Sequence, residues 1–524
     1  MLETPLRPIR RVLIVMVALL TLATSSPVRA AYHPLEELPV ESALYGLLDA
    51  VITQYGAGVG FPHTRPWTKR DIGRFLDDVR ANSTAAATDP AVVRLSRELE
   101  PGDGLGGWEP MGGFSDDARS IEVSSYARAD YQEDRARGGV IRDLRAGLQF
   151  SAALGENALL WSDVYAGTTS AGPHGNPADS RRFGLLEDVQ INSYYDRATA
   201  TLDGKLGRLT LGHTWLRWGP GAWGTMALSD GAPALDVAEM RTSLGSRAML
   251  TWFIASLETR DESFLAGHRL ELRPSRALQF SLSELARFDG VANLPLYALP
   301  LVPFSLLEKR VQKASALPSD SLERLGKNNV MWAADFSWRA RPGTRFYGEI
   351  AIDDVSISSE QRPKLVAWQL GAQMRRVRGP AAWEARGEYA RVYALTYSVY
   401  HGHDFMHAGM PTGFPLGPDV DRLSGRISFS PEPDWTWAIE GSLTRKGEGR
   451  LGEAYTPGDP VPDNLVLQGI LDRDLRAALS VDYSPSPGVR LGLTGGYARI
   501  DGLGHQAGLE ASGLYGSTRA TLRW

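Results

Sequence analysis

The side chains best suited to chemistry are acidic and basic residues that recur in segments of alternating polarity. In a large β-barrel, such residues would line the lumen with charge pairs and water. Alternatively, they could form a sugar-binding surface, in which charged groups bond hydroxyls or uronate carboxylates beside aromatic rings that cover apolar sugar faces. We predict that they share one strand face; they are Glu349, Asp353, Glu384, Arg386, Glu388 and Arg391.

Other chemistries find little support in the sequence. The chain has no cysteine, which removes thiolate nucleophiles and thiolate metal sites. It has no nucleophile elbow, phosphate loop or paired-His zinc helix, and residues 102–107 match a dinucleotide spacing without the flanking strand and helix. A cluster of His401, His403, Asp404 and His407 could bind a metal, but a Gly-containing loop does not preorganise ligands, so we expect a solvated loop. The missing motifs weaken an enzymatic function without excluding it, and we expect no metal and no cofactor.

Charge and composition narrow the range of partners. The 524-residue chain carries 56 Lys and Arg against 61 Asp and Glu, so it lacks the basic surplus that nucleic acid binding needs. We expect no nucleic acid partner; a neutral or sugar-like partner fits better.

The N-terminal sequence is typical of an exported protein. Arg7, Arg10 and Arg11 precede an apolar run over residues 12–22, and residues 28–30 provide a small-residue cleavage site. We predict a signal peptide over residues 1–30. A retained anchor is the alternative, but the run is shorter than a bilayer span requires.

Residues 31–115 are predicted to form a helical region and a linker. Apolar spacing indicates helices beginning near Leu44, after the capping-box-like Thr68, and over residues 90–100, followed by a Gly-rich linker over residues 101–113. The apolar stretch 293–307 contains three prolines, so we interpret it as a loop or lumen segment rather than a spanning helix.

From residue 116 to 524 the periodicity is two, as in half-buried strands. Phe346, Ile350 and Ile352 alternate with charged residues, and the chain ends with Ala520, Leu522 and Trp524 alternating with polar residues. A soluble sandwich shows the same alternation, but export, the aromatic end and tryptophans near segment ends favour a membrane barrel. We predict a mainly β fold: a closed antiparallel transmembrane barrel of 16 to 18 strands, with 18 favoured.

A strand over residues 207–212 precedes Arg217-Trp218-Gly219-Pro220-Gly221 and then Leu228-Ser229-Asp230. This region resembles the signature of the capsule assembly Wzi family, and residues 64–68, 329–354 and 417–419 also look similar to that family. The resemblance implies an outer-membrane barrel of a Gram-negative bacterium with helices at its periplasmic side. It also implies a non-enzymatic lectin that attaches capsular or extracellular polysaccharide. Its expected partners are that polysaccharide, outer-membrane lipid and the polysaccharide export machinery.

The turn at residues 217–221 is expected to be structural first. Pro220 fixes its own φ, while Gly219 and Gly221 permit backbone angles that a Cβ would hinder. At a barrel rim, Trp218 and Trp223 would anchor at the lipid interface, which we favour, or stack on sugar. The candidate polysaccharide-binding or motif residues are Arg217, Trp218, Gly219, Pro220, Gly221, Trp223, Asp230, Glu349, Asp353, Glu388 and Arg391.

Two other functions remain open on the same barrel. A porin or sugar-transport channel would need an aqueous lumen. A surface glycosidase would need two solvent-facing carboxylates about 5 to 9.5 Å apart.

Overall fold

The computed structural model describes residues 33–99, 112–115, 119–171, 192–258, 262–300, 302–307, 328–354, 363–399, 402–455 and 465–523. The predicted signal peptide, the Gly-rich residues 102–107, His401 and Trp524 lie outside these ranges.

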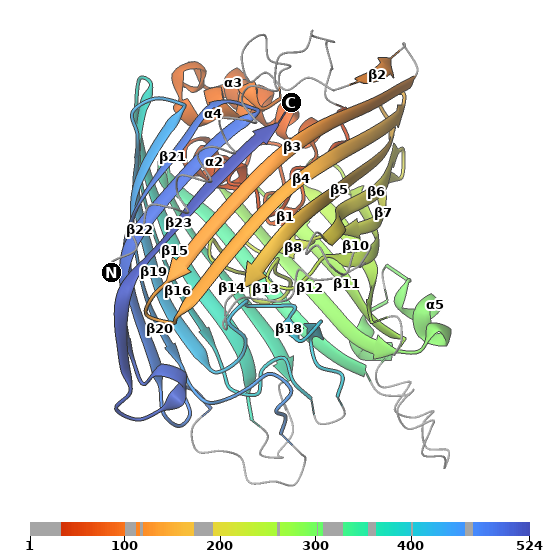
Figure 1. The fold of residues 1–524 in the computed structure, drawn as a ribbon. Coiled ribbons are helices and arrows are strands. Elements are labelled where there is room, and N and C mark those ends of the chain that lie inside the picture. The colour runs from red at the N-terminus through yellow and green to blue at the C-terminus, as the bar shows by residue number, and fades with distance from the viewer. Residues whose placement is uncertain are drawn as a thin grey trace.

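Eighteen antiparallel strands form a closed barrel (Figure 1), which confirms the predicted fold and the favoured strand number. Closure is made by β23, which pairs with β3 from Tyr515↔Asp134 to Arg523↔Tyr126. No helix in the described ranges is long and apolar enough to cross a membrane. The strands are β3 (Arg119–Asp134), β4 (Gly139–Leu154), β5 (Ala158–Ala171), β6 (Asn192–Gly204), β7 (Gly207–Thr214), β9 (Leu235–Ser243), β10 (Ala248–Glu258), β11 (Ser263–Leu272), β12 (Leu278–Asp289), β13 (Asn328–Arg341), β14 (Thr344–Asp354), β15 (Leu365–Arg378), β16 (Ala381–Val392), β19 (Val420–Ser430), β20 (Trp435–Lys446), β21 (Asp472–Ser486), β22 (Val489–Asp501) and β23 (Glu510–Arg523).

The strands alternate apolar residues outside with polar residues inside. On β14, Phe346 and Ile350 are 42% and 38% exposed, whereas Arg345 and Tyr347 are at most 1% exposed within the filled lumen. Membrane barrels show this arrangement because their outer face meets lipid. It confirms the alternation predicted for this segment.

Aromatic side chains gather where strands meet the short turns. Trp338 lies near Phe346 with ring centroids 6.0 Å apart, and Trp383 stacks on Phe429 at 4.3 Å. Trp437, near the start of β20, is 49% exposed. Such rings favour the membrane interface, so the predicted girdle is present at this end of the barrel.

The two ends of the barrel differ in their connections. Turns at residues 155–157, 342–343 and 487–488 are short, whereas the opposite end carries the connections 215–234 and 393–419. Outer-membrane barrels place short turns in the periplasm and long loops outside. By this rule we expect the short-turn end, where the N-terminal helices lie (Figure 1), to be the periplasmic end.

The three predicted helices are present as α2 (Leu44–Tyr55), α3 (Lys69–Asn82) and α4 (Pro90–Arg97). Thr68 and Asp71 form a complete capping box at the start of α3, which satisfies free amides of the first turn. The helices pack on one another through a shared apolar cluster that includes Val51, Phe75 and Leu95. The last residues of the predicted linker, from Gly112, are not a loop. They begin a short strand, β2 (Gly112–Ser115), which pairs with β3.

The proline-containing stretch 293–307 is a loop, as predicted, but its described part does not enter the lumen. It includes α5 (Leu294–Tyr297), which lies outside the barrel wall (Figure 1). The Glu284 carboxylate on the outer face of β12 accepts hydrogen bonds from the backbone amides of Phe304 and Ser305, at 2.8 and 2.9 Å. The His268 ring lies 4.0 Å from that of Phe304. The lumen alternative is therefore wrong: cross-strand partners Glu284 and His268 hold the loop outside.

Candidate functional site

The signature segment leaves the barrel wall and folds into the lumen. Residues Arg217–Trp218 form β8, which pairs antiparallel with β1 (Thr64–Arg65) from the N-terminal region. The Trp218 amide donates to the Leu228 carbonyl at 2.9 Å. Its indole is 0% exposed and packs edge-on against Phe253 at 5.1 Å. Two segments far apart in sequence thus join inside the barrel.

The glycines of this turn are needed for two different reasons. Gly219 has φ +126°, and a Cβ there would lie 2.6 Å from a Glu349 oxygen. Gly221 has no positive φ, but a Cβ there would lie 2.0 Å from the Gly224 carbonyl oxygen and 2.2 Å from Gln369 Nε2. Gly219 is therefore required by its backbone angle, and Gly221 is required because there is no space for a side chain. Pro220 lies between them and is buried.

Two wall carboxylates hold the turn by accepting hydrogen bonds. Glu349 on β14 accepts from the Met226 amide at 2.7 Å. Glu388 on β16 accepts from the amides of Ala222 and Trp223, at 2.8 and 3.4 Å, and from the Tyr347 hydroxyl at 2.9 Å. A carboxylate that accepts backbone amides in a low-dielectric interior is a strong anchor. Both residues are thus brought to the signature turn as structural supports.

Two further candidates act in the same way. Arg217 pairs with Asp230 at 3.2 Å and also donates to the Gly221 carbonyl. Asp353 accepts from the Tyr397 amide at 2.7 Å, which ties the connection 393–419 to β14. The bonds of Arg217 hold the two ends of the signature segment together, and the bond of Asp353 fixes the connection 393–419 to the wall.

Arg391 does not share a face with the other charged residues, so that prediction is wrong. Glu388 points into the lumen, and Arg391 lies three positions further along the same strand, which places it on the outer face. There it pairs with Asp421 at 2.8 Å.

The two tryptophans are not rim anchors at the lipid interface. Trp218 lies within the lumen's apolar cluster, which also includes Phe253, Tyr397 and Phe414. Trp223 is partly exposed and lines a chamber inside the barrel. The lipid-anchor interpretation is therefore wrong, while a stacking role remains possible only for Trp223.

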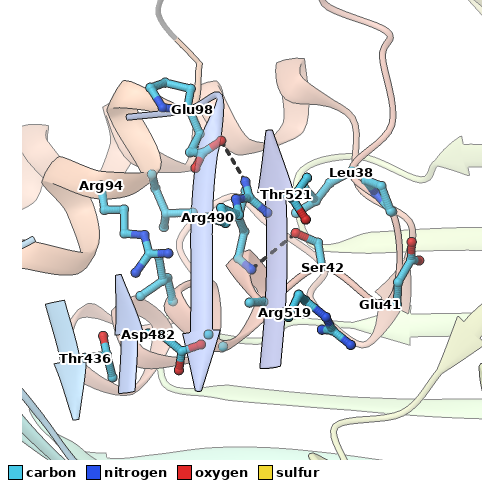
Figure 2. Close-up of a pocket in the computed structure, with 18 of the residues that line it drawn as sticks. Leu38, Glu41, Ser42, Arg94, Glu98, Thr436, Asp482, Arg490, Arg519 and Thr521 are labelled. Atoms are coloured by element: carbon cyan, nitrogen blue, oxygen red, sulfur yellow. Dashed lines mark hydrogen bonds and ion pairs between the residues drawn. The ribbon is translucent and has the colours of Figure 1, made fainter. Parts of the chain in front are cut away.

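That chamber has a volume of 590 Å³ and lies between the N-terminal helices and the barrel wall. Figure 2 shows Arg94 of α4 and Glu98, the residue after α4, on one side of the chamber, where Glu98 pairs with Arg490 of β22 at 2.8 Å. Its lining includes ten arginines and one lysine against eight carboxylates. The Arg519 side chain is 54% exposed, so this part of the lumen is solvated.

Most of the charged lining was not singled out from the sequence, although strand alternation had signalled part of it. The polar residues that alternate with Ala520 and Leu522 are Arg519, Thr521 and Arg523, and all three line the chamber, which leaves Ala520 and Leu522 on the outer face. Arg94 gave no comparable signal, because its helix meets the wall only in the folded protein.

The helices are held to the wall by buried ion pairs. Asp49 of α2 lies 3.3 Å from both Arg345 and Arg386 and 3.4 Å from Arg65. Burial alone would raise the pKa of Asp49, but Arg345, Arg386 and Arg65 outweigh it and hold the pKa well below its usual range. Asp89, which caps α4, receives two hydrogen bonds from Arg375 at 2.5 and 2.7 Å.

The histidine cluster is buried rather than solvated. His403 and His407 are each 2% exposed, and His403 lies 3.1 Å from Asp289. Among the described residues, no group of three or more His, Asp or Glu side chains is arranged to hold a metal ion.

Neither a protein-family profile nor a curated protein matches the chain. Among solved structures, it is similar to Wzi of Escherichia coli, described as a carbohydrate-binding β-barrel involved in group 1 capsule assembly. The TM-score is 0.62 and the identity 14%, over 93% of this chain and 99% of that one. The likeness shows that the chain shares the fold of this outer-membrane protein, a closed β-barrel. OpdK of Pseudomonas aeruginosa, an outer-membrane protein, is also similar, with a TM-score of 0.44 and 11% identity over 79% of this chain and all of that one.

Proposed function

We propose that this protein is a non-enzymatic outer-membrane lectin that attaches capsular or extracellular polysaccharide to the cell surface, working with the export machinery. The observation that carries the proposal is the filled lumen. The chain folds its own segment 215–234 into the barrel, and an apolar cluster around Trp218 joins it to wall strands and to the connection 393–419. A porin needs a wide aqueous lumen, and in this barrel the chain itself fills much of that space.

The chemistry of the remaining space also suits sugar. The chamber combines arginines and carboxylates with hydroxyl side chains such as Thr494 and Thr521, and with the partly exposed ring of Trp223. Such a lining can bond sugar hydroxyls and cover an apolar sugar face. The likeness of fold to a carbohydrate-binding barrel supports this interpretation.

The test is a surface-retention assay in the native host. Cells lacking the gene are compared with cells carrying a restored copy, and cell-bound and released polysaccharide are measured separately. We expect the deletion to move polysaccharide from the cell-bound to the released fraction without reducing the total. Unchanged retention would refute the proposal, and a fall in the total would indicate a role in synthesis or export instead.

A channel is the second candidate, because the chamber is solvated and its Arg519 and Asp482 side chains are about half exposed. Purified protein in planar bilayers separates the two functions. A lectin of this construction should give little single-channel current, whereas a porin should give stable large steps. A reducing-end assay on purified polysaccharide tests the glycosidase alternative, and we expect no new reducing ends.

A further inference from the structure

The outer wall carries a charged cluster at the extracellular ends of β16, β19, β20 and β21. Its members face away from the lumen, because each lies an even number of positions from an exposed apolar residue of its own strand. Strand register places them side by side, Arg391↔Asp421, Asp421↔Arg445 and Arg445↔Arg473. We call this set the outer-wall arginine cluster: Arg391, Asp421, Arg445 and Arg473.

One carboxylate neutralises only part of this cluster. Asp421 is 2% exposed and accepts from Arg445 Nε at 2.9 Å, from Arg391 at 2.8 Å and from the Tyr389 hydroxyl at 2.9 Å. Three guanidinium groups and one carboxylate leave a surplus of positive charge. The Arg391 and Arg445 side chains remain 28% and 38% exposed, so they can reach a further anion.

Arg473 differs from the other two arginines, because it has no acidic partner among the residues that the structure describes. It is exposed, and no acidic side chain in the described ranges lies within 4.0 Å of its guanidinium group. Asp501 is its partner in register, but that carboxylate pairs with Arg499 at 3.1 Å. Arg473 instead lies directly across from Arg445, and like charges in such a pair are destabilising unless an anion lies between them.

The next outward-facing row of these strands is apolar. Leu423, Leu443 and Leu475 are neighbours in register, and they are 55%, 38% and 55% exposed. This row lies two positions toward the periplasm from Asp421, Arg445 and Arg473, where the wall meets acyl chains. Positive groups directly above an acyl-facing surface match a lipid whose anionic headgroup lies at the same level.

We propose that the outer-wall arginine cluster binds the phosphate group of an acylated, phosphorylated glycolipid of the outer leaflet. Arg473 and Arg445 hold the phosphate oxygens between them, and Leu443 and Leu475 contact the acyl chains below. Arginine suits this role because its planar guanidinium group pairs with phosphate through two parallel hydrogen bonds. Asp421 keeps the Arg391 and Arg445 side chains in place.

The test uses the full-length protein in detergent, with bound lipid measured by native mass spectrometry. The probes are a hexa-acylated glucosamine disaccharide bisphosphate and the same lipid with its phosphates removed. The variant is Arg473→Gln, which breaks no ion pair among the residues that the structure describes. The matched control is Arg499→Gln, also on the outer wall at this end, whose arginine is already paired with Asp501. Heat-dependent gel mobility checks that each variant is folded.

We expect wild type and Arg499→Gln to prefer the phosphorylated lipid by about fivefold, the effect of roughly one basic contact at a membrane surface. Arg473→Gln should lose most of this preference. Equal binding of both lipids to wild type, or equal losses in the two variants, would overturn the proposal. An acidic oligosaccharide without acyl chains is the third probe. If it binds better than the lipid and Arg473→Gln removes that binding, the site serves polysaccharide and the lipid proposal is wrong.

Discussion

Replacing Gly221 with valine should undock the signature turn while leaving the barrel closed. The new Cβ would lie 2.0 Å from the Gly224 carbonyl oxygen and 2.2 Å from Gln369 Nε2, so the backbone of the turn must shift even if the Gln369 side chain turns away. Overpacking of this kind costs about 1 to 3 kcal/mol. Where the shift also takes the amides of Ala222 and Trp223 away from Glu388, the loss of those partners adds about 1 to 3 kcal/mol or more.

The assay is thermal unfolding, followed by heat-dependent gel mobility, together with single-channel recording. The variant should run as a folded barrel at low temperature, convert to the unfolded form at a lower temperature than wild type, and show intermittent current. Gly245→Val is the matched control, because Gly245 has φ +80° in an open turn with no atom within 4 Å of its Cβ position. That control should lower the midpoint through backbone strain without producing current. Wild-type stability and wild-type conductance in Gly221→Val would refute the assigned packing of the turn.

Three further predictions address the helices, the chamber and closure of the barrel. Asp49→Asn should expose α2 to protease, since it leaves Arg345 and Arg386 without their anion at a cost of about 3 to 5 kcal/mol. Because the pKa of Asp49 is depressed, the stabilisation that it gives is present above about pH 4 and is lost only in stronger acid. A loss of protection from protease between pH 5 and 7 in the wild-type protein would therefore contradict the assignment. Trp223→Ala should lower polysaccharide retention at normal outer-membrane levels if the ring stacks on sugar, whereas a parallel fall in both would show a structural role, and no change in either would remove this ring from the site. Deleting Trp524 should reduce assembly into the outer membrane, because the last strand closes the barrel; normal levels would count against that role.

Much of the fold could be predicted because its signals are local. Two-residue alternation identifies strands without knowledge of their neighbours, and the Thr68 capping box marks the start of α3 from four adjacent residues. The error at Arg391 came from not applying this rule strictly. Glu388 and Arg391 are separated by an odd number of positions, so strict counting along one strand assigns them to opposite faces.

The interior could not be predicted in this way, because it depends on pairings between distant segments. Trp218 is buried because β8 meets β1, and nothing near Trp218 in the sequence identifies Thr64 as its partner. Asp49 resembles any polar residue on an amphipathic helix until Arg345 and Arg386 are brought to it from two separate strands. Sequence reasoning therefore identified the turn at residues 217–221 as a distinct element but placed it at the barrel rim, whereas it lies in the lumen.

The way in which the lumen is filled bears on what the barrel can do. The turn is held by carboxylates that accept backbone amides, and the helices are held by a carboxylate among arginines. Contacts of this kind are costly to break once water is excluded, so they fix one arrangement instead of permitting a gate that opens readily. Water enters the chamber beside β19 to β23. The outer faces of strands in this part of the wall carry the outer-wall arginine cluster at their extracellular ends. One part of the barrel is thus a rigid support, and the strands beside the chamber present charged groups both inward to water and outward to lipid. Under the proposed function, the rigid interior would support the bound polymer and the outer-wall arginine cluster would contact lipid, so the retention assay and the lipid-binding assay test the two surfaces separately.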